Sequence, residues 1–318
     1  MLNLTIRQMR TLVAISRHGK ISHAANALGL TSPAVTLQLQ QVEAEVGAQL
    51  FIREKTGVIL TETGSTVLER AHEILSTLDA LEQDLARLKG MGAGTIRLGV
   101  VSTGKYFAPR AIAAFSARFP DIEIKLFAAN RTEIIRRLRN HEIDLALMGR
   151  PPRDFPVKSA VIGDHPHLFI ADPGHPLANR LDIDPRELAS FRFITREPGS
   201  GTRSLFELFM AEVSGGMKHI PAEMDSNETI KQAVAAGLGI AFISGHTIEQ
   251  ELAGGKLRIL DVTGTPIKRH WFLVRSANRL ATPAIEAFQQ FMATNGMALL
   301  PVIGKTYSTP DAIPAGLE

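Results

Sequence analysis

Hydroxyl, amide and guanidinium side chains recur between residues 102 and 227 of this chain, and side chains of these types bind anions. Arginine presents a planar fork of donors to a phosphate or carboxylate, and the first backbone N–H groups of a helix add further donors. The candidate set comprises Ser102, Thr103, Lys105, Asn130, Arg131, Thr132, Arg150, Glu197, Ser200, Thr202, Arg203 and Asn227. These residue types predict a site for a small anionic molecule.

Most of the candidates follow segments that we expect to form strands. The expected strands are 95–101, 122–128, 144–148, 240–244 and 269–275, and the expected helices are 109–118, 132–139, 200–213, 227–236 and 282–293. This alternation predicts an α/β fold with a parallel, doubly wound sheet. Because open α/β sheets bind ligands beyond the carboxyl ends of their strands, we expect the candidates to meet at one edge of the sheet.

Two plainer interpretations of these residues stay open. Serine, threonine and asparagine are common helix N-caps, so any one of them can serve its own helix and bind nothing else. An α/β enzyme or a solute-binding protein with an N-terminal oligomerisation module would use the same side chains. The segment 199–202 is not followed by Gly-Lys-Ser or Gly-Lys-Thr, which argues against nucleotide hydrolysis.

Composition excludes several other kinds of chemistry. The chain has no cysteine, so it holds no disulfide, thiolate metal site or cysteine nucleophile. His165, His167 and His175 lie close together, but no Glu or Cys stands at metal-ligand spacing, and we interpret them as surface or core histidines. The absence of a long apolar run and of a signal sequence favours a cytoplasmic protein that contacts no membrane.

The first 42 residues differ from the rest in charge, although the net charge of the whole chain is only +3. They contain Arg7, Arg10, Arg17 and Lys20, and the first carboxylate is that of Glu43. A positive surface confined to one small region is what contact with nucleic-acid phosphates requires.

Capping signals divide the same region into three helices. The expected N-caps are Thr5 (with Gln8 in a capping box), Ser22 and Ser32 (with Pro33 at the first helical position), and the expected helix ends are Gly19 and Gly29. Each of these residue types is common at its position for a physical reason, hydrogen bonding at the N-cap and left-handed backbone at the C-terminal glycine. The result is a helix-turn-helix at about 21–40.

The outward face of the third helix carries Thr36, Leu37, Gln38 and Gln40, which suit the edges of DNA bases. A plain three-helix bundle would instead carry lysine and glutamate on a solvated face. Residues 50–53 and 58–60 then predict a hairpin with Lys55 at its tip, a wing that can touch the DNA backbone.

A long helix is expected from Thr61 to about residue 89. Its apolar residues have heptad spacing: Val67, Ala71, Ile74, Leu78, Leu81, Leu85 and Leu88. A single helix cannot bury such a seam by itself, so we expect it to pair with the same helix of a second subunit. Packing against the rest of its own chain is the alternative.

The first 65 residues closely resemble the LysR-type transcriptional regulators. The resemblance is carried by LTIRQMRTLVAISRHGKISHAANALGLTSPAVTLQLQQVEAEVGAQLFIRE, followed by LTETG. It implies base contacts from Ser32, Pro33, Thr36 and Leu37, and backbone or minor-groove contacts from Thr31, Arg53 and Lys55. Leu37 departs from the family, in which arginine often stands there, and so implies an apolar contact where a guanine reader is common.

The resemblance also implies the architecture and the partners. An N-terminal winged helix-turn-helix would be joined by a linker helix to two Rossmann-like subdomains of the periplasmic-binding-protein type, with the ligand between them. The expected boundaries are 1–61 for the DNA-binding domain, 62–89 for the linker helix, 90–94 for a hinge, 95–300 for the effector-binding domain (95–163 with 269–300, and 164–268) and 301–318 for a fraying tail. The implied partners are double-stranded DNA, a homodimer or homotetramer, a small effector and RNA polymerase.

Two segments resemble one subgroup of that family. REPGSGTR and DSNETIKQAVAAGLGIAFIS are similar to segments of the regulators of Calvin-cycle carbon-fixation operons. The similarity implies no resident cofactor and an inducer that is a phosphorylated metabolite, such as a phosphorylated sugar, or NADPH. We expect this inducer to lie among Ser102, Arg131, Arg150, Thr202 and Arg203.

Overall fold

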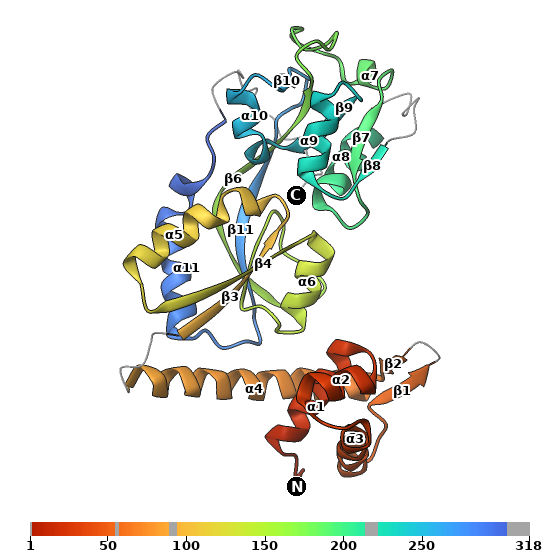
Figure 1. Cartoon of the computed structure of the whole chain (residues 1–318), viewed down its shortest axis with the longest axis vertical. Helices are drawn as coiled ribbons and strands as arrows, with labels where there is room; N and C mark the ends of the chain where they lie inside the picture. Colours follow the sequence, from red (N-terminus) through yellow and green to blue (C-terminus); the bar gives the residue numbers. More distant parts are fainter. Residues whose placement is uncertain (1, 55–56, 89–93, 214–221, 304–318) are drawn as a thin grey trace. The chain divides into compact units, whose positions relative to one another are not determined.

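The computed structural model describes residues 2–54, 57–88, 94–213 and 222–303 (Figure 1). Contacts within the chain divide it into two compact units, Met1–Gly94 with Ala277–Pro283 and Thr95–Ser276 with Ala284–Glu318. Each unit has a hydrophobic core of its own. In the parts of the chain that the structure describes, no helix is both long enough and apolar enough to cross a membrane.

The first unit consists of three short helices, a hairpin and one long helix. They are α1 (Ile6–His18), α2 (Ile21–Leu28), α3 (Ser32–Val46), β1 (Phe51–Glu54), β2 (Gly57–Leu60) and α4 (Glu62–Leu88). Ile15, Ala24 and Val35, one from each short helix, are fully buried where those helices meet. The expected helix-turn-helix and its hairpin are therefore confirmed.

The helix ends follow the sequence signals with two corrections. Thr5 and Gln8 form both bonds of the capping box, and Gly19 and Gly29 end their helices in left-handed backbone. However, α2 begins at Ile21 and has no side-chain cap, so Ser22 lies inside the helix. The N-cap of α3 is Thr31, whose hydroxyl accepts from the Ala34 N–H, because Thr31 is the residue with extended backbone. Ser32 is the first residue of that helix.

Helix α4 starts where expected, with the Thr61 hydroxyl accepting from the Gly64 N–H at 2.9 Å. The residues of its apolar seam differ in solvent exposure along the helix. Ala71 is buried, whereas Ile74, Leu81 and Leu85 are 42%, 53% and 45% exposed. The side chain of Leu88 lies outside the described part. Leu78 is half-buried, so the described residues of its own chain cover the C-terminal half of the seam only in part.

The second unit contains one mixed sheet with the strand order β4-β3-β5-β11-β6-β9-β7-β8, and β10 pairs with β6. Its elements are β3 (Gly94–Val101), η1 (Gly104–Tyr106), α5 (Ala108–Arg118), β4 (Ile122–Ala129), α6 (Arg131–Arg139), β5 (Leu145–Met148), β6 (Val157–Ala171), α7 (Pro185–Leu188), β7 (Phe193–Arg196), α8 (Gly201–Ala211), β8 (Ala222–Met224), α9 (Asn227–Ala235), β9 (Ile240–Ser244), η2 (Gly245–Thr247), α10 (Glu249–Ala253), β10 (Arg258–Leu260), β11 (Ile267–Ser276), α11 (Pro283–Asn295) and η3 (Met297–Leu299). The α/β fold is confirmed.

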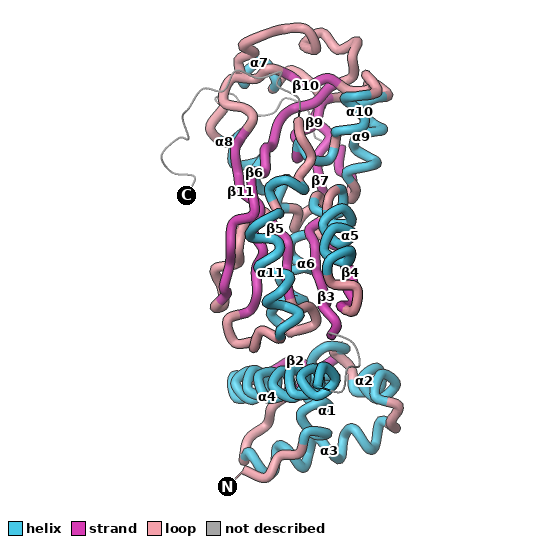
Figure 2. Tube along the Cα trace, turned by 90° about the vertical axis from the view of Figure 1, so that its left-hand side faces the viewer, coloured by secondary structure: helices cyan, strands magenta, loops and turns pink. Residues whose placement is uncertain are grey.

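The long strands β6 and β11 run side by side through the middle of this sheet (Figure 2). They pair antiparallel with each other, and β11 is also antiparallel to β5, while β3 with β5 and β7 with β9 are parallel. The expected parallel pairing is therefore confirmed for β3 with β5 and for β7 with β9, whereas β11 pairs antiparallel with β5 and with β6. Two antiparallel strands join the β4–β3–β5 side to the β9–β7–β8 side, as the family resemblance implies.

The chain after α11 packs against the second unit. Leu300 is buried, and Ile303 contacts the core around Ile243 and Leu257. The side chains of Leu300 and Ile303 thus hold residues 300–303 against this unit, and residues 301–303 belong to the tail that we expected to fray. Residues 304–318 lie outside the described part.

Candidate functional site

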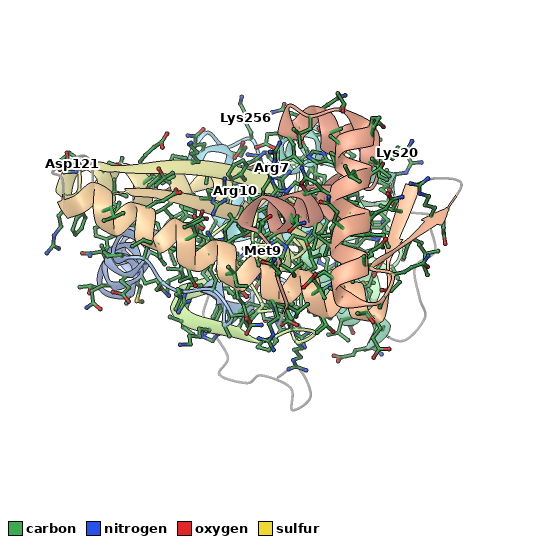
Figure 3. The ribbon with its side chains drawn as sticks, turned by 90° about the horizontal axis from the view of Figure 1, so that it is seen from below. Arg7, Met9, Arg10, Lys20, Asp121 and Lys256 are labelled. Atoms are coloured by element: carbon green, nitrogen blue, oxygen red, sulfur yellow. The ribbon has the colours of Figure 1, made fainter. Side chains whose placement is uncertain are left out.

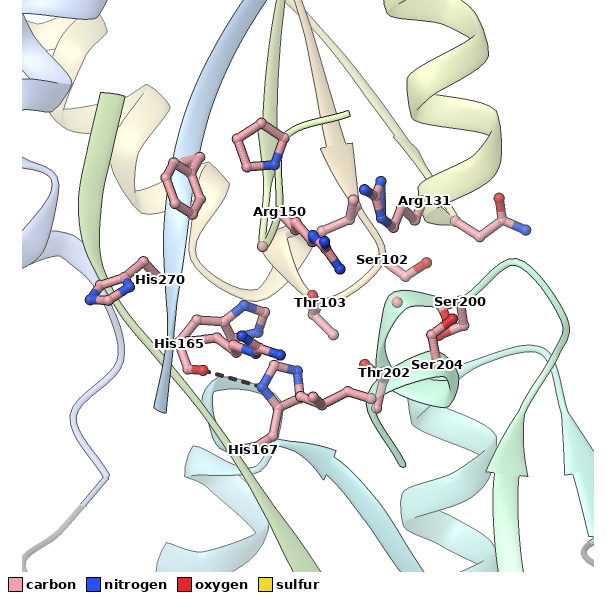
Figure 4. Close-up of a pocket in the computed structure, with 18 of the residues that line it drawn as sticks. Ser102, Thr103, Arg131, Arg150, His165, His167, Ser200, Thr202, Ser204 and His270 are labelled. Carbon is pink, nitrogen blue, oxygen red and sulfur yellow. Dashed lines mark hydrogen bonds between the residues drawn. The ribbon is translucent and has the colours of Figure 1, made fainter. Parts of the chain in front are cut away.

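A cavity of about 680 Å³ lies in the second unit where β6 and β11 cross between the two sides of the sheet. The loops after β3 and β5, the start of α6, the end of β7 and the start of α8 close around it (Figure 4). It is lined by six permanent cations: Arg131, Arg150, Arg153, Arg196, Lys268 and Arg269. None of the described residues that line it carries a carboxylate. The cavity is therefore electrostatically suited to an anion.

The structure brings seven of the candidate residues to this cavity. They are Ser102, Thr103, Asn130, Arg131, Arg150, Ser200 and Thr202. Five candidates do not line it: Lys105, Thr132, Glu197, Arg203 and Asn227. The expected position at the carboxyl ends of strands holds for the seven, which come from the loops after β3, β4, β5 and β7.

The hydroxyl and amide side chains at the cavity are not all helix caps. Asn130 is a cap, because its side-chain oxygen accepts from the Glu133 N–H at 3.0 Å. Ser200 holds the N-cap position of α8 but makes no capping bond, and it is only 4% exposed. Thr202 is 5% exposed in the first turn of the same helix. Ser200 and Thr202 therefore keep their hydroxyls for the cavity, beside the N–H groups that begin an eleven-residue helix.

Arg131 and Arg150 lie close enough together for their positive charges to repel each other. Burial lowers the pKa of Arg131, and the positive charge of Arg150 lowers it further. The Nη1 of Arg131 is buried and has no hydrogen-bond partner. The pKa of Arg269 is also lowered by burial and by Arg150. An anion bound here would relieve this repulsion and supply the missing acceptor.

Arg196 organises the cavity wall and was not among the candidates. Its guanidinium pairs with Glu197 at 2.8 and 3.0 Å, donates to the Asn227 side-chain oxygen at 2.7 Å and reaches the Ser102 hydroxyl at 3.3 Å. Glu197 and Asn227 thus act through Arg196 and not as direct ligands. The Ser102 bond joins the β3 side of the sheet to the β7 side. Arg196 is the first residue of the segment REPGSGTR, and a basic residue at the start of that segment is the signal that could have indicated it.

Other candidates are engaged elsewhere. The Lys105 ammonium pairs with Glu228 at 2.8 Å, and the Tyr106 hydroxyl donates to the other oxygen of that carboxylate at 2.6 Å. The Thr132 hydroxyl donates to the Gly199 carbonyl at 3.5 Å. These contacts link η1 to α9 and the start of α6 to the loop before α8.

The expectation that Arg203 lies in the cavity is wrong. Its guanidinium pairs with Glu207 at 2.8 Å and with Glu223, and it donates to the Arg196 carbonyl at 3.0 Å. Ser204 and Leu208 line the cavity from the same helix, so Arg203 and Glu207 point to its other face.

Replacing Arg203 by alanine should leave effector affinity within twofold of the parent protein. Both acidic partners of Arg203 are more than half exposed, so the free energy of unfolding should fall by only about 1 kcal/mol. Calorimetric titration of the effector and thermal unfolding measure the two quantities. A loss of effector binding would place Arg203 at the ligand.

His165 and His167 line the cavity floor, a role that the sequence did not indicate. Burial lowers the pKa of His165 well below its usual value and lowers that of His167 to about 3, so both rings are neutral at pH 7. His165 stacks on Trp271 with ring centres 3.8 Å apart. In the described part of the chain no group of histidines and carboxylates could hold a metal ion.

The first unit presents the other candidate surface. Thr31, Pro33 and Leu37 are exposed along the start of α3, and Leu37 is 56% exposed. The hydroxyl of Thr36 donates to the Ser32 carbonyl at 2.9 Å, which leaves its lone pairs to accept a hydrogen bond from a base. Gln38 does not face outward as expected, since its side-chain oxygen accepts from the buried Thr11 hydroxyl at 2.6 Å.

Basic side chains surround this helix. Arg7, Arg10 and Lys20 are exposed on the same unit (Figure 3). Arg53 is exposed on the first strand of the hairpin, whereas Lys55 lies outside the described residues. The exposed face of α3 can contact the bases of a DNA duplex, and the cations beside it can contact the phosphates.

An N-terminal helix-turn-helix and a C-terminal ligand-binding unit define the chain as a bacterial regulator of transcription. Residues 6–65 match the model of the bacterial regulatory helix-turn-helix proteins of the LysR family, and residues 89–296 match the LysR substrate binding domain. The chain belongs to the LysR family. The alternatives of an enzyme or a solute-binding protein are thereby rejected.

Several individual proteins are similar to this chain. The regulator CbbR of Rhizobium meliloti is 54% identical over 307 residues, covering 96% of this chain and 98% of that protein. The RuBisCO operon transcriptional regulator of Allochromatium vinosum is 40% identical over 291 residues, covering 92% and 96%. Among solved structures, the regulatory domain of CcmR from Synechocystis in complex with 2-PG is 35% identical with a TM-score of 0.61, covering 63% of this chain and 96% of that one.

Proposed function

We propose that this regulator binds a dyad-symmetric operator as a homo-oligomer and responds to a small phosphorylated metabolite, a phosphorylated sugar or NADPH, held in the cavity of the second unit. The observation that carries the proposal is the cavity itself, with six cations and no described carboxylate. Arg131 and Arg150 repel each other there, and a bound anion would offset that repulsion. The full-length relatives are named as regulators of the RuBisCO operon and as CbbR, which supports carbon-fixation genes as the targets.

The effector would act by favouring one arrangement of the two sides of the sheet. Ser102 and Arg131 belong to the β4–β3–β5 side, and Ser200 and Thr202 to the β9–β7–β8 side. An anion that bonds to both sides shifts the equilibrium only by its differential affinity for the two arrangements. The same coupling must let DNA change the affinity for the effector. At the promoter we expect a contact with RNA polymerase, in the cytoplasm where the chromosome lies.

Thermal unfolding of the full-length protein with inorganic phosphate, phosphorylated sugars, NADPH and aromatic carboxylates tests the ligand class. A ligand at 100 times its Kd should stabilise the protein by about 2.7 kcal/mol. A shift with aromatic carboxylates and none with phosphates would contradict the proposal.

Substitutions in the first unit should separate base reading from phosphate contact. Thr36→Ala is expected to cost about 1–3 kcal/mol on the operator and little on random duplex DNA, because it removes a base contact. Arg53→Ala should weaken binding to both DNAs alike and make the slope of log K against log salt less negative by about 1 per lost phosphate contact. Fluorescence anisotropy across a salt series measures both, and equal losses from Thr36→Ala on the two DNAs would refute the assignment.

A further inference from the structure

His167 presents a ring nitrogen to a cavity whose six cations can only donate hydrogen bonds. The hydroxyls of Ser102, Thr103, Ser200, Thr202 and Ser204, which also line the cavity, can donate as well as accept. His167 lies among them on the floor, 4% exposed, with its ring 4.2 Å from His165 and 5.8 Å from Phe242 between ring centres. These two neighbours fix the plane of the imidazole.

One hydrogen bond decides which nitrogen of His167 carries the proton. The Nδ1 atom lies 3.2 Å from the backbone carbonyl oxygen of His165 (Figure 4). A carbonyl oxygen can only accept, so Nδ1 must be the donor. The Nε2 atom of the neutral ring then carries a lone pair. None of the described residues makes a hydrogen bond to it.

The surroundings of His167 keep its ring neutral. Burial is the largest effect that lowers the pKa of His167, and the bond to the His165 carbonyl opposes it. His246 from η2 and Arg269 from β11 lower the pKa further by charge repulsion, to about 3. At neutral pH the Nε2 atom of His167 therefore carries no proton and can accept a hydrogen bond in the cavity.

We propose that His167 selects anionic ligands that also carry a hydroxyl group, which donates its hydrogen bond to Nε2. This inference rests on the proposed function and adds a requirement to it. Cations and helix N–H groups take the phosphate, and Nε2 takes a hydroxyl of the same molecule. A phosphate ester without that hydroxyl leaves a buried acceptor unpaired or places a second acceptor against it, which is costly.

Matched ligand pairs test this requirement on the full-length protein. Glycerol 3-phosphate is compared with propyl phosphate, and 3-phosphoglycerate with 3-phosphonooxypropanoate, by calorimetric titration. We expect the hydroxylated member of at least one pair to bind roughly tenfold more tightly than its partner. Equal affinities within both pairs, or binding of neither hydroxylated compound, would overturn the proposal.

Substitution of His167 assigns the preference to this residue. In His167→Phe, which keeps an aromatic ring against Phe242, the ratio of the two affinities should fall to within twofold of one. In His167→Gln, whose side-chain oxygen can accept, part of the ratio should return. A residue that only supported the fold would change both affinities by the same factor. His175→Phe, a substitution of a half-buried histidine that does not line the cavity, should keep the full ratio.

Proton uptake distinguishes an acceptor from a cation at this position. Titrations in two buffers of different ionisation enthalpy give the number of protons bound with the ligand. We expect none at Nε2, because the ligand brings its own proton on the hydroxyl. Uptake of about one proton that disappears in His167→Phe would overturn the proposal, since His167 would then bind as an imidazolium.

The proposed function and this inference fail in different ways. If neither inorganic phosphate nor any phosphate ester binds, the cavity is not a phosphate site, and both fall. If phosphate esters bind and the hydroxyl makes no difference, the phosphate site stands and the role of His167 falls.

Discussion

Replacing Arg131 by glutamine should raise the melting temperature of the ligand-free protein and, at the same time, weaken effector binding by about 10- to 150-fold. The guanidinium is partly buried, its Nη1 has no partner, and Arg150 repels it. Removing the charge relieves that repulsion, and we expect a gain of about 2 °C. The bound anion, however, loses a charge-assisted hydrogen bond, which contributes about 1.5–3 kcal/mol.

The melting temperature and the effector affinity of Arg131→Gln are expected to change in opposite directions, which a general loss of stability would not produce. A variant that merely disturbed the fold would lower both the melting temperature and the affinity. Arg203→Gln is the matched control, because this arginine lies on α8 outside the cavity and should leave effector affinity unchanged. Thermal unfolding without ligand and calorimetric titration with it give the two numbers. A lower melting temperature, or unchanged affinity, in Arg131→Gln would remove Arg131 from the anion site.

Placing a charge on the exposed seam of α4 should cost the protein its dimer and about two orders of magnitude in operator affinity. Leu81 is 53% exposed and lies on the same helix face as Ile74 and Leu85. Leu81→Glu should fold normally, because the side chain has little cover within its own chain. In a paired seam the glutamate would lie buried against its symmetry mate. A separated protomer binds only one half-site and loses the gain from linked binding, which is about 10²-fold or more.

Ser65→Glu is the control, since it places the same charge on the opposite, exposed face of the helix. Sedimentation velocity measures assembly, and anisotropy with a full operator and with an isolated half-site measures DNA binding. The half-site affinity should be the same for the parent protein and Leu81→Glu. An intact dimer in Leu81→Glu would show that the subunits associate through another surface.

The sequence by itself determined the first unit almost completely, because its signals are local. A capping box at Thr5, left-handed glycines at 19 and 29 and the alternation in the hairpin each act within a few residues. The errors there are small: Ser22 lies inside α2 and does not cap it, the N-cap of α3 is one residue earlier, and Gln38 turns inward to meet Thr11. Local hydrogen bonding and backbone preference suffice for elements of this kind.

In the second unit the sequence indicated the type of site but not its complete membership. The strand ends placed Ser102, Arg131 and Thr202 at the cavity, because parallel strands bring their carboxyl ends to one edge. On α8, Thr202 and Arg203 are neighbours in the sequence, yet only Thr202 faces the ligand space. Successive helical residues lie about 100° apart, so their roles depend on which face of the helix the sheet covers.

Only the tertiary structure decided the cavity floor. His165, His167 and Arg269 come from β6 and β11, which pair with each other across about a hundred residues of sequence. Neighbouring side chains of a strand point to opposite faces, so which of them enter the cavity depends on the register of that pairing. Register is a property of distant segments, and the charge state of His167 follows from it, because its burial and its neighbours His246 and Arg269 exist only in the folded chain. The tautomer follows from the carbonyl of His165, two residues away on the same strand.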